Sequence, residues 1–456
     1  MPECRHQVIC ARNGGESTEE DLCILHSHNP GKDKQLFVKA LEEHQKNKGH
    51  DFSFFVFPIK GDFHKAEFTK GACFANVKFT EGATFSWAKF SGHRGAKMFA
   101  GARFSGAEFT DRANFHEAEF SDGATFGRAI FTKGADFSSA KFTKDADFAG
   151  AEFRDGAAFQ EALFTKGVNF GWTKFTKGAD FAGAEFTGKS RFSRAEFLGR
   201  TLFVGKQPRM VVGRRLKDFK DKPLNVKIET AQIFANAEID FTDALIEPLD
   251  AVIFRDADLR QCLFLGTDVR KAEFTDVRWS RVGLRFCVHD EFAPLGVLEI
   301  VRQYAKIEQL YRELKQNYED RRDYERAGEF HFGEKVMRRR NPNTRWGLWF
   351  LLTLYSVFSG YGERYLRPLL WAGILLVSSA VLYFSLGLQP KSAVYQSSQD
   401  WITAFLYSLR VMTLFRADEL ANPLTVYGWV VVAVESILGP LFLGLFALAV
   451  RQRLKR

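Results

Sequence analysis

Phenylalanine recurs along the first half of the chain at spacings that alternate between five and six residues. A small residue, usually alanine, stands two positions before nearly every one of these phenylalanines. The resulting eleven-residue unit fits neither the 3.6-residue period of an α-helix nor the two-residue period of a strand. It indicates a coil in which each short side buries one large and one small side chain. The series comprises Phe63, Phe68, Phe74, Phe79, Phe85, Phe90, Phe104, Phe109, Phe115, Phe120, Phe126, Phe131, Phe137, Phe142, Phe148, Phe153, Phe159, Phe164, Phe170, Phe175, Phe181, Phe186, Phe192, Phe197 and Phe203.

Glycine usually precedes the small residue of the six-residue steps. Because glycine adopts a positive φ at low cost, these positions predict tight corners. They are Gly71, Gly82, Gly123, Gly134, Gly156, Gly167 and Gly178. A second block over about 231–279 keeps a strict five-residue step, as in Ala257-Asp258-Leu259 and Ala272-Glu273-Phe274.

Both blocks resemble the pentapeptide-repeat family, in which a large and a small residue point into each side of a right-handed quadrilateral β-helix. The resemblance implies a pentapeptide-repeat solenoid with four sides to each turn. The first block would then make about six turns of ~4.8 Å, a rod of ~30 Å. Its additional sixth residues lead us to expect a larger and less regular coil there than in the second block.

A solenoid end exposes an unpaired strand edge, so the sequence should provide a cap. The segment Asp33–Lys48 predicts a helix that could serve as this cap. The apolar residues expected on its covering face are Leu36, Phe37, Ala40 and Leu41.

Beyond the repeats, the spacing of apolar residues predicts two connector helices over Ile300–Asn317 and Tyr324–Arg340. The expected divisions of the chain before the membrane are 31–60 for the N-terminal cap helix and strand, 61–203 for the first solenoid block, 204–227 for a basic linker, 228–285 for the second block and 286–344 for the α-helical hairpin.

The remaining segment, 345–456, is apolar in stretches of different length. Pro368–Leu388 and Val426–Val450 are long enough to cross ~30 Å of hydrocarbon. Trp346–Phe358 is too short to cross and is rich in residues that favour the membrane interface. Asp400–Phe415 is apolar and helical in length, yet too short to span and return. We therefore expect a two-helix transmembrane domain with an interfacial helix at 346–358, a first crossing at 368–388, a re-entrant helix at 400–415 and a second crossing at 426–450.

Basic residues flank the two crossings on the same side, whereas the loop Gln389–Asp400 carries one Lys and one Asp. The positive-inside rule places the solenoid and both termini in the cytoplasm. Met1–Asn29 is polar and carries no apolar secretory signal. We expect a two-pass integral membrane protein of a bacterial inner membrane.

The order of these helices, over about the last ninety residues, resembles the two-helix pore unit of potassium channels. The potassium filter reads Thr-Val-Gly-Tyr-Gly-Asp, and the matching run here is Thr413, Leu414, Phe415, Arg416, Ala417 and Asp418. Both filter glycines, which let successive carbonyl groups face the axis, are replaced, and Arg416 stands in the tyrosine position. The resemblance implies a multimeric pore, with a tetramer favoured, that does not select potassium. The alternative is a re-entrant segment that packs without conducting.

Glu435 stands in the middle of the second predicted crossing, where a carboxyl group is costly and functional by default. In one interpretation it lines the pore or pairs with Arg410 or Arg416. In the other it is a protonated carboxyl group bonded to a neighbouring helix. Gly439 and Pro440 follow and predict a hinge, because proline removes a helix hydrogen bond.

Cys4, Cys10, Cys23 and His26 supply three thiolates and one imidazole, the ligand number of a closed tetrahedral zinc site. Without an export signal these cysteines are expected to be reduced rather than paired in disulfides. Zinc-knuckle-like segments of this kind occur ahead of the repeats in related proteins. The sequence therefore predicts a zinc knuckle over 1–30, and the alternative is a set of free thiols.

The charge balance, 64 Lys+Arg against 55 Asp+Glu, gives a formal net charge of +9. Some relatives of this fold mimic DNA with an acidic surface, so a basic chain does not favour that role, and we expect no nucleic-acid partner. Four lysines at equivalent corners form either a positive ridge facing anionic lipid or a solvated face that keeps the rod soluble. They are Lys133, Lys144, Lys166 and Lys177.

The sequence contains no Gly-x-Ser-x-Gly, phosphate loop, dinucleotide fingerprint or paired catalytic carboxylates, so we do not expect an enzyme. Two hypotheses for function remain. The first is a membrane ion channel whose cytoplasmic repeat domain serves as a gating or partner-binding module. The second is a non-conducting scaffold or sensor that is anchored in the lipid bilayer while its repeat rod recruits a partner.

Overall fold

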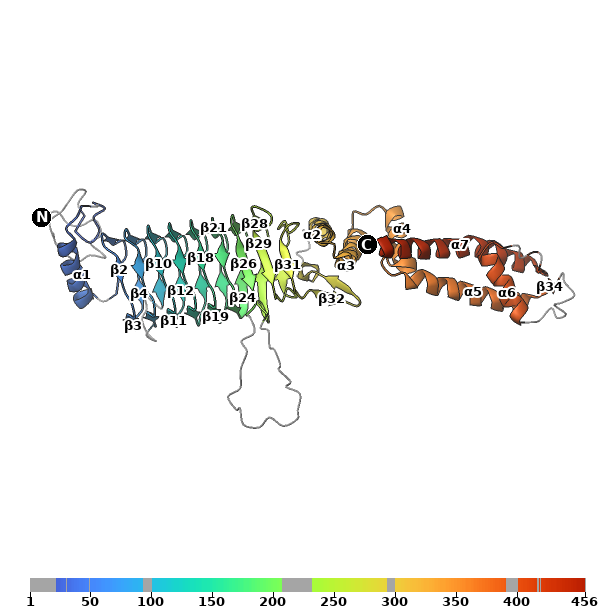
Figure 1. Cartoon of the computed structure of the whole chain (residues 1–456), viewed down its shortest axis with the longest axis horizontal. Coiled ribbons are helices and arrows are strands. Elements are labelled where there is room, and N and C mark those ends of the chain that lie inside the picture. The colour runs from blue at the N-terminus through green and yellow to red at the C-terminus, as the bar shows by residue number, and fades with distance from the viewer. Residues whose placement is uncertain are drawn as a thin grey trace, which may run out of the picture. The chain divides into compact units, whose positions relative to one another are not determined.

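The computed structural model divides the chain into two compact units, Met1–Pro294 and Leu295–Arg456 (Figure 1). The residues it describes are 22–29, 31–48, 50–92, 101–206, 232–292, 300–390, 401–415, 418 and 420–455. Most of the predicted linker 204–227 lies outside the described residues, as do Cys4, Cys10, Arg416 and Ala417.

The first unit is a stack of short parallel strands that form four sheets (Figure 1). The first sheet contains, in spatial order, β1 (Val56–Phe57), β5 (Lys78–Phe79), β9 (Glu108–Phe109), β13 (Ile130–Phe131), β17 (Glu152–Phe153), β21 (Lys174–Phe175), β25 (Glu196–Phe197) and β28 (Leu245–Ile246). The second contains β2 (Gly61–Asp62), β6 (Ala83–Thr84), β10 (Ala113–Asn114), β14 (Ala135–Asp136), β18 (Ala157–Ala158), β22 (Ala179–Asp180), β26 (Thr201–Val204), β29 (Val252–Arg255) and β31 (Glu273–Thr275).

The other two sheets complete the coil. The third contains β3 (Glu67–Phe68), β7 (Lys89–Phe90), β11 (Glu119–Phe120), β15 (Lys141–Phe142), β19 (Leu163–Phe164) and β23 (Glu185–Phe186). The fourth contains β4 (Ala72–Cys73), β8 (Ala102–Arg103), β12 (Ala124–Thr125), β16 (Ala146–Asp147), β20 (Val168–Asn169), β24 (Gly188–Arg191), β27 (Ala237–Asp240) and β30 (Cys262–Leu263). Because consecutive strands fall in successive sheets, each turn has four sides, as a repeat β-helix solenoid requires.

The register between neighbouring strands measures the length of one turn. Ala113 pairs with Ala135, and Glu119 pairs with Lys141, so two eleven-residue units make one turn of 22 residues. This register is unchanged for every described pairing that starts between residues 101 and 182. The expectation of a less regular first block is therefore wrong, because the sixth residues recur in the same place in each turn. The second block is the uneven one: Ile239 pairs with Cys262, 23 residues later, whereas Phe254 pairs with Phe274, 20 residues later.

The phenylalanines form continuous stacks inside the coil. The rings of Phe104 and Phe126 are parallel with centroids 4.9 Å apart, and those of Phe126 and Phe148 are 4.7 Å apart. These separations match the ~4.8 Å between neighbouring strands, so ring stacking and strand pairing share one repeat distance. Ala118 and Ala129 are fully buried beside the rings and leave room for them. The predicted division into large and small inward side chains is confirmed.

Corners are formed in two ways. Two residues after alternate phenylalanines the backbone is left-handed without glycine, as at Glu117 (φ 55°), and the N–H of Ala118 donates to the carbonyl of Phe115 at 3.0 Å. At the six-residue steps Gly178 has φ 93°, as predicted. Gly156 lies outside the left-handed region, so the glycine expectation fails there.

The N-terminal end of the coil is covered by α1 (Lys34–Lys48), whose first turn is capped by the Asp33 carboxylate accepting from the N–H of Gln35 at 2.7 Å. Phe37 and His44 are buried, and their rings pack on the phenylalanines of the first turn. Leu36, which was predicted to lie on the covering face, is 47% exposed because that face is formed by positions 37, 40 and 44.

The other end of the coil is closed by the antiparallel hairpin β32 (Ser280–Val282) and β33 (Arg285–Cys287), followed by the short helix η1 (His289–Glu291). The buried Asp290 carboxylate accepts from the N–H groups of Phe264 and Leu265 at 3.0 and 2.8 Å. In the turns before it, such N–H groups donate to the carbonyl oxygens of the next turn. Asp290 therefore takes the place of the missing turn.

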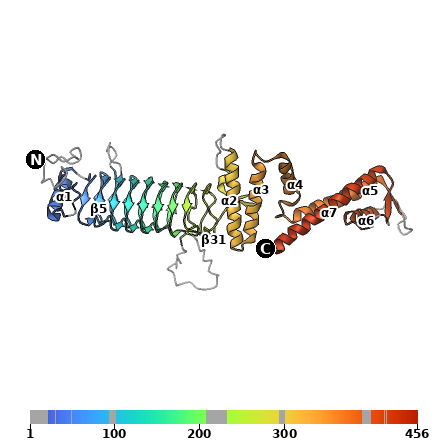
Figure 2. The same cartoon turned by 90° about the horizontal axis from the view of Figure 1, so that it is seen from above.

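The second unit is helical (Figure 2). Its helices are α2 (Ile300–Asp320), α3 (Tyr324–Arg340), α4 (Trp346–Ser359), α5 (Leu366–Leu386), α6 (Trp401–Met412) and α7 (Val426–Lys455), and its short strands are β34 (Leu388–Pro390) and β35 (Ala421–Pro423). α2 and α3 form the expected hairpin. Tyr318 and Phe330 stack between them with centroids 5.4 Å apart, and Asp323 caps α3.

Gly178 and Gly156 offer a matched test of the corner geometry. A Cβ at Gly178 would lie 1.9 Å from the carbonyl oxygen of Arg200, whereas a Cβ at Gly156 meets nothing within 4 Å. Gly178→Ala should lower the free energy of unfolding by about 1–3 kcal/mol, and Gly156→Ala should change it by less than about 0.5 kcal/mol. Denaturant unfolding of the full chain in detergent measures both. Equal effects would contradict the register described here.

Asp290 should make solenoid stability depend on pH. Burial raises the pKa of Asp290 to about 7, above an unfolded value of about 4. The folded state thus holds the proton more tightly, so the stabilising contribution is complete below about pH 4 and is lost as pH rises through about 7. Stability should fall between about pH 5 and about pH 8, and Asp290→Asn, which cannot titrate, should flatten that part of the profile. Identical pH profiles in denaturant unfolding would refute this role.

Candidate functional site

Two helices of the second unit are long and apolar enough to cross a membrane, α5 and the part of α7 over Val426–Arg451. The predicted crossings at 368–388 and 426–450 fall on these helices. Large apolar side chains such as Leu370 and Ile437 are more than half exposed on them. Such surfaces suit contact with lipid or with another copy of the chain.

α6 lies between α5 and α7 and runs back along them (Figures 1 and 2). It begins beside the C-terminal end of α5, where the rings of Phe384 and Trp401 are 6.1 Å apart. It ends at Met412, which packs with Ala372 near the start of α5 and with Phe442 of α7.

After α6 the chain returns to the end of the bundle from which α6 began. β34 and β35 pair antiparallel there, with Gln389 opposite Asn422. The N–H of Leu424 also donates to the carbonyl of Gly387, directly after α5, at 3.2 Å. A short helix that enters between two long ones and comes back on the same side is a re-entrant arrangement.

The residues that directly follow α6 form a helix cap instead of an extended strand. Leu414 is left-handed with φ 58°. The N–H of Phe415 donates to the carbonyl of Arg410 at 2.9 Å, and that of Leu414 to Val411 at 3.1 Å. This is the bonding of a Schellman motif, with a leucine where glycine is usual. Among the described residues of the matched run, Thr413, Leu414 and Phe415 therefore do not align their carbonyl groups as a potassium filter does.

The side chains at this cap are open in a single chain. Leu414 is 66% exposed and Phe415 is 73% exposed, although both follow a helix that packs between two apolar helices. Asp418 is exposed too. The exposed residues lie where a neighbouring copy of the chain would find them.

Glu435 is fully buried among the three helices of the bundle. The hydroxyl of Tyr383 on α5 donates to its Oε2 at 2.8 Å, and the hydroxyl oxygen of Ser408 on α6 lies 2.5 Å from its Oε1. Of the two interpretations of Glu435, bonding to neighbouring helices is the one that these contacts match.

Gly439 and Pro440 lie in the middle of α7, which remains one helix through them. Gly439 faces Met412 at the end of α6: an added Cβ would be 2.5 Å from its Cγ and 2.8 Å from its carbonyl oxygen. The close approach of α6 to α7 thus requires a glycine here. Whether this pair acts as a hinge stays a prediction.

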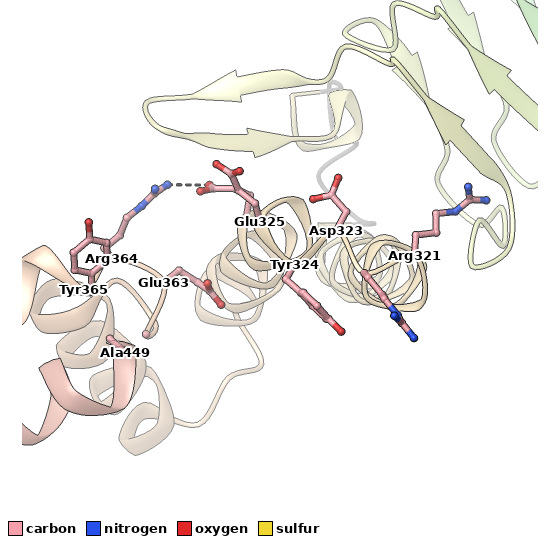
Figure 3. A pocket seen from close by; sticks show the side chains of 11 residues that line it. Arg321, Asp323, Tyr324, Glu325, Glu363, Arg364, Tyr365 and Ala449 are labelled. Atoms are coloured by element: carbon pink, nitrogen blue, oxygen red, sulfur yellow. Dashed lines mark hydrogen bonds and ion pairs between the residues drawn. The ribbon is translucent and has the colours of Figure 1, made fainter. Parts of the chain in front are cut away.

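A pocket of about 590 Å³ joins the connector hairpin to the inner ends of the membrane-length helices (Figure 3). It is lined by the turn between α2 and α3, the start of α3, the linker between α4 and α5, and Ala449 of α7. Arg364 from the linker pairs with Glu329 of α3 at 2.9 Å and lies over the ring of Phe332. Burial raises the pKa of the Glu329 carboxyl group, and Arg364 opposes this shift.

Two of the four predicted zinc ligands are described, and they lie together. Cys23 Sγ is 3.0 Å from His26 Nδ1. The buried Lys32 holds this segment to the solenoid, because its ammonium donates to the carbonyls of Ser27 and Val56. Burial lowers the pKa of Lys32 to about 8. Within the described ranges no group of three His, Cys, Asp or Glu residues is close enough to hold a metal, so zinc binding stays a prediction.

Three of the four corner lysines are engaged in ion pairs with the preceding turn. Lys133 pairs with Asp111 at 2.9 Å, and Lys144 and Lys177 pair in the same way with Asp122 and Asp155. Their charge is partly neutralised, which favours the solvated face over a positive ridge.

Sequence reasoning missed Tyr383, Ser408 and Met412 as members of the site. The signal for Ser408 was weak, because it is a lone hydroxyl in the apolar helix that precedes the matched run. Tyr383 looked like an interfacial aromatic. Both are visible as partners only when the three helices are placed side by side.

Comparison with known proteins identifies the repeats. The family model for pentapeptide repeats (9 copies) matches residues 95–141 and 128–171, within the first block of the solenoid. No curated protein and no solved structure matches the chain.

Gly439 and Gly444 give a matched pair on α7. A side chain at Gly439 would collide with the backbone of Met412, whereas one at Gly444 meets nothing within 4 Å. Gly439→Ala should force α6 away from α7 and destabilise the bundle by about 1–3 kcal/mol. Gly444→Ala should be close to neutral. Thermal unfolding in detergent compares them, and an unperturbed Gly439→Ala variant would mean that α6 does not pack here.

Proposed function

We propose that this chain assembles, with a tetramer favoured, into a membrane pore of low potassium selectivity whose repeat domain is a cytoplasmic gating or partner-binding module. The lipid bilayer is its first partner, and a bacterial inner membrane is its proposed location. The basic flanks of the two crossings support a topology with both ends in the cytoplasm. The proposal involves neither catalysis nor binding of nucleic acid.

The single observation that carries the proposal is the return of the chain after α6. Non-helical backbone at membrane depth is tolerated only where it is buried in protein or lines water. Met412 lies next to residues in the middle of α7, so the turn after it is at that depth in a membrane. Leu414 and Phe415 are exposed in one chain, and several copies around an axis would enclose them beside a passage.

The form of the cap supports low selectivity. Potassium selection needs successive carbonyl groups that replace the hydration shell of the ion. At Leu414 the backbone turns left-handed, and the carbonyls of Arg410 and Val411 are occupied by helix-capping bonds. A pore built from this cap would present side chains to the ion instead of a row of carbonyls.

Gating from the cytoplasmic side would act through the Arg364–Glu329 pair. α3 and the linker that leads into α5 are joined by this ion pair and by the packing of Phe332 on Tyr361. Both contacts border or adjoin the pocket that also reaches Ala449 near the end of α7. A movement of the connector hairpin would therefore reach both membrane-length helices.

The second candidate function, a non-conducting anchored scaffold or sensor, is favoured by one observation. The end of α6 satisfies its own backbone through the Schellman bonds, and the Thr413 hydroxyl donates back to the carbonyl of Leu409 at 2.6 Å. A segment that is satisfied internally does not require water. Its repeat rod would then recruit a partner while the helices serve only as the anchor.

We also propose that the N-terminal segment binds zinc through Cys4, Cys10, Cys23 and His26. The short distance between Cys23 and His26 suits two ligands of one ion, since tetrahedral zinc sites combine thiolate and imidazole ligands in this way. Bound zinc would stabilise the segment that Lys32 attaches to the first turn of the solenoid.

Planar-bilayer recording of the purified full chain tests conduction. We expect unitary currents whose reversal potential barely distinguishes potassium from sodium. Glu329→Gln, which breaks the ion pair with Arg364 outside the bundle, should change open probability several-fold while unitary conductance stays the same.

No currents under voltage, tension or ligand would leave the scaffold. A separate exchange distinguishes the two functions: a scaffold keeps its function when one unrelated transmembrane helix replaces 345–456, and a channel loses it.

A further inference from the structure

The buried carboxyl group of Glu435 is the point at which all three helices of the bundle meet. Tyr383 from α5 donates to its Oε2 at 2.8 Å, and Ser379, also from α5, bonds to the same carboxyl group. Ser408 from α6 lies 2.5 Å from its Oε1. The Ser408 oxygen is also 3.0 Å from the carbonyl oxygen of Leu376 on α5.

Counting hydrogen atoms restricts the state of this network. A serine hydroxyl has one proton to donate, and a backbone carbonyl can only accept. When Ser408 donates to Leu376, the proton between Ser408 and Glu435 must belong to the carboxyl group. Every polar atom then has a partner: the carboxyl O–H donates to Ser408, Ser408 donates to Leu376, and Tyr383 donates to the other carboxyl oxygen.

An ionised Glu435 would break this arrangement. Ser408 would have one proton for two acceptors, so either the carboxylate or the Leu376 carbonyl would lose its bond. A carboxylate buried among apolar helices is also costly without a paired cation. That cost would be relieved if α6 moved away and let water reach the carboxylate.

The ionisable groups around Glu435 are few. Tyr383 on α5 and Tyr407 on α6 face it, with their rings edge to face at 4.9 Å. The charged residue of α6 is Arg410, and Asp418 follows in the loop. α5 after Arg367 and α7 before Arg451 contribute no other charged side chain in sequence.

We propose that Glu435 is a proton-binding site whose proton holds α6 between α5 and α7. Loss of the proton to bulk water leaves the carboxylate, turns the Ser408 hydroxyl from Leu376 towards Glu435 Oε1, and weakens the packing of α6. The proposal concerns the helix bundle and does not depend on conduction. In a conducting assembly it would make the position of α6, and hence the pore, respond to pH.

Infrared spectroscopy of the full-length protein in lipid nanodiscs gives the first test. The spectrum of the wild type at neutral pH should contain a protonated-carboxyl C=O band that is missing in Glu435→Gln. Ser408→Ala and Tyr383→Phe should each shift this band, because each removes one bond to the carboxyl group. A wild-type spectrum without the band, or a band that neither substitution moves, overturns the proposal. The two latter variants keep the test valid if Glu435→Gln fails to fold.

Hydrogen exchange of the α6 amides gives the second test, and a merely structural glutamate would not pass it. The side-chain amide introduced by Glu435→Gln can donate to Ser408 and accept from Tyr383, so this variant mimics the protonated acid at every pH. Above the pH at which Glu435 titrates, α6 in the wild type should exchange faster than in Glu435→Gln by up to about tenfold per pH unit. An equal pH dependence in both proteins overturns the proposal. Neither measurement uses current, so a silent bilayer recording and a failed proton site are distinguishable.

Discussion

A backbone that leaves its helix inside a membrane must find partners for its N–H and C=O groups, because hydrocarbon provides none. In this protein the constraint governs the whole helical bundle. The chain leaves α6 through a Schellman cap at Leu414, returns to a two-stranded pair between β34 and β35, and joins α6 to its neighbours through Ser408. The glycine at 439 lets the two helices approach closely enough for these bonds to form. The function that we propose follows from the one part of this path, the exposed end of α6, that a single chain leaves uncovered.

The solenoid solves the same problem of backbone satisfaction in water by repetition. Each strand is only two residues long for most of the rod, so no strand would be stable alone. Stability comes from neighbouring turns, where ring stacking and strand pairing have the same spacing, as for Phe104 and Phe126. The ends are the exceptions, and there a helix and the Asp290 carboxylate supply the missing partners. A rod held in this way is a stiff element on which a partner or a gating force could act.

The sequence was sufficient where one residue type repeats under one physical demand. The phenylalanine period predicted four sides and the buried alanines, because only one arrangement fits an alternation of five and six. It was insufficient where a side chain meets a distant partner. Leu414 adopts a left-handed conformation that favours glycine, so nothing in the letters marked a helix cap, and the resemblance to a filter suggested an extended strand. Glu435 was recognisable as costly, but its partners Ser408 and Tyr383 lie on other helices.

The most direct test of the re-entrant path is the accessibility of position 415 in sealed membranes. A Phe415→Cys variant would be treated from outside with membrane-impermeant thiol reagents of small and large size. The described native cysteines are buried, and the others lie on the side assigned to the cytoplasm. The account predicts that the small reagent reacts from outside while the large one is excluded, because the residue faces a narrow wet space below the surface. Equal reaction with both reagents, or reaction only from the solenoid side, would contradict it.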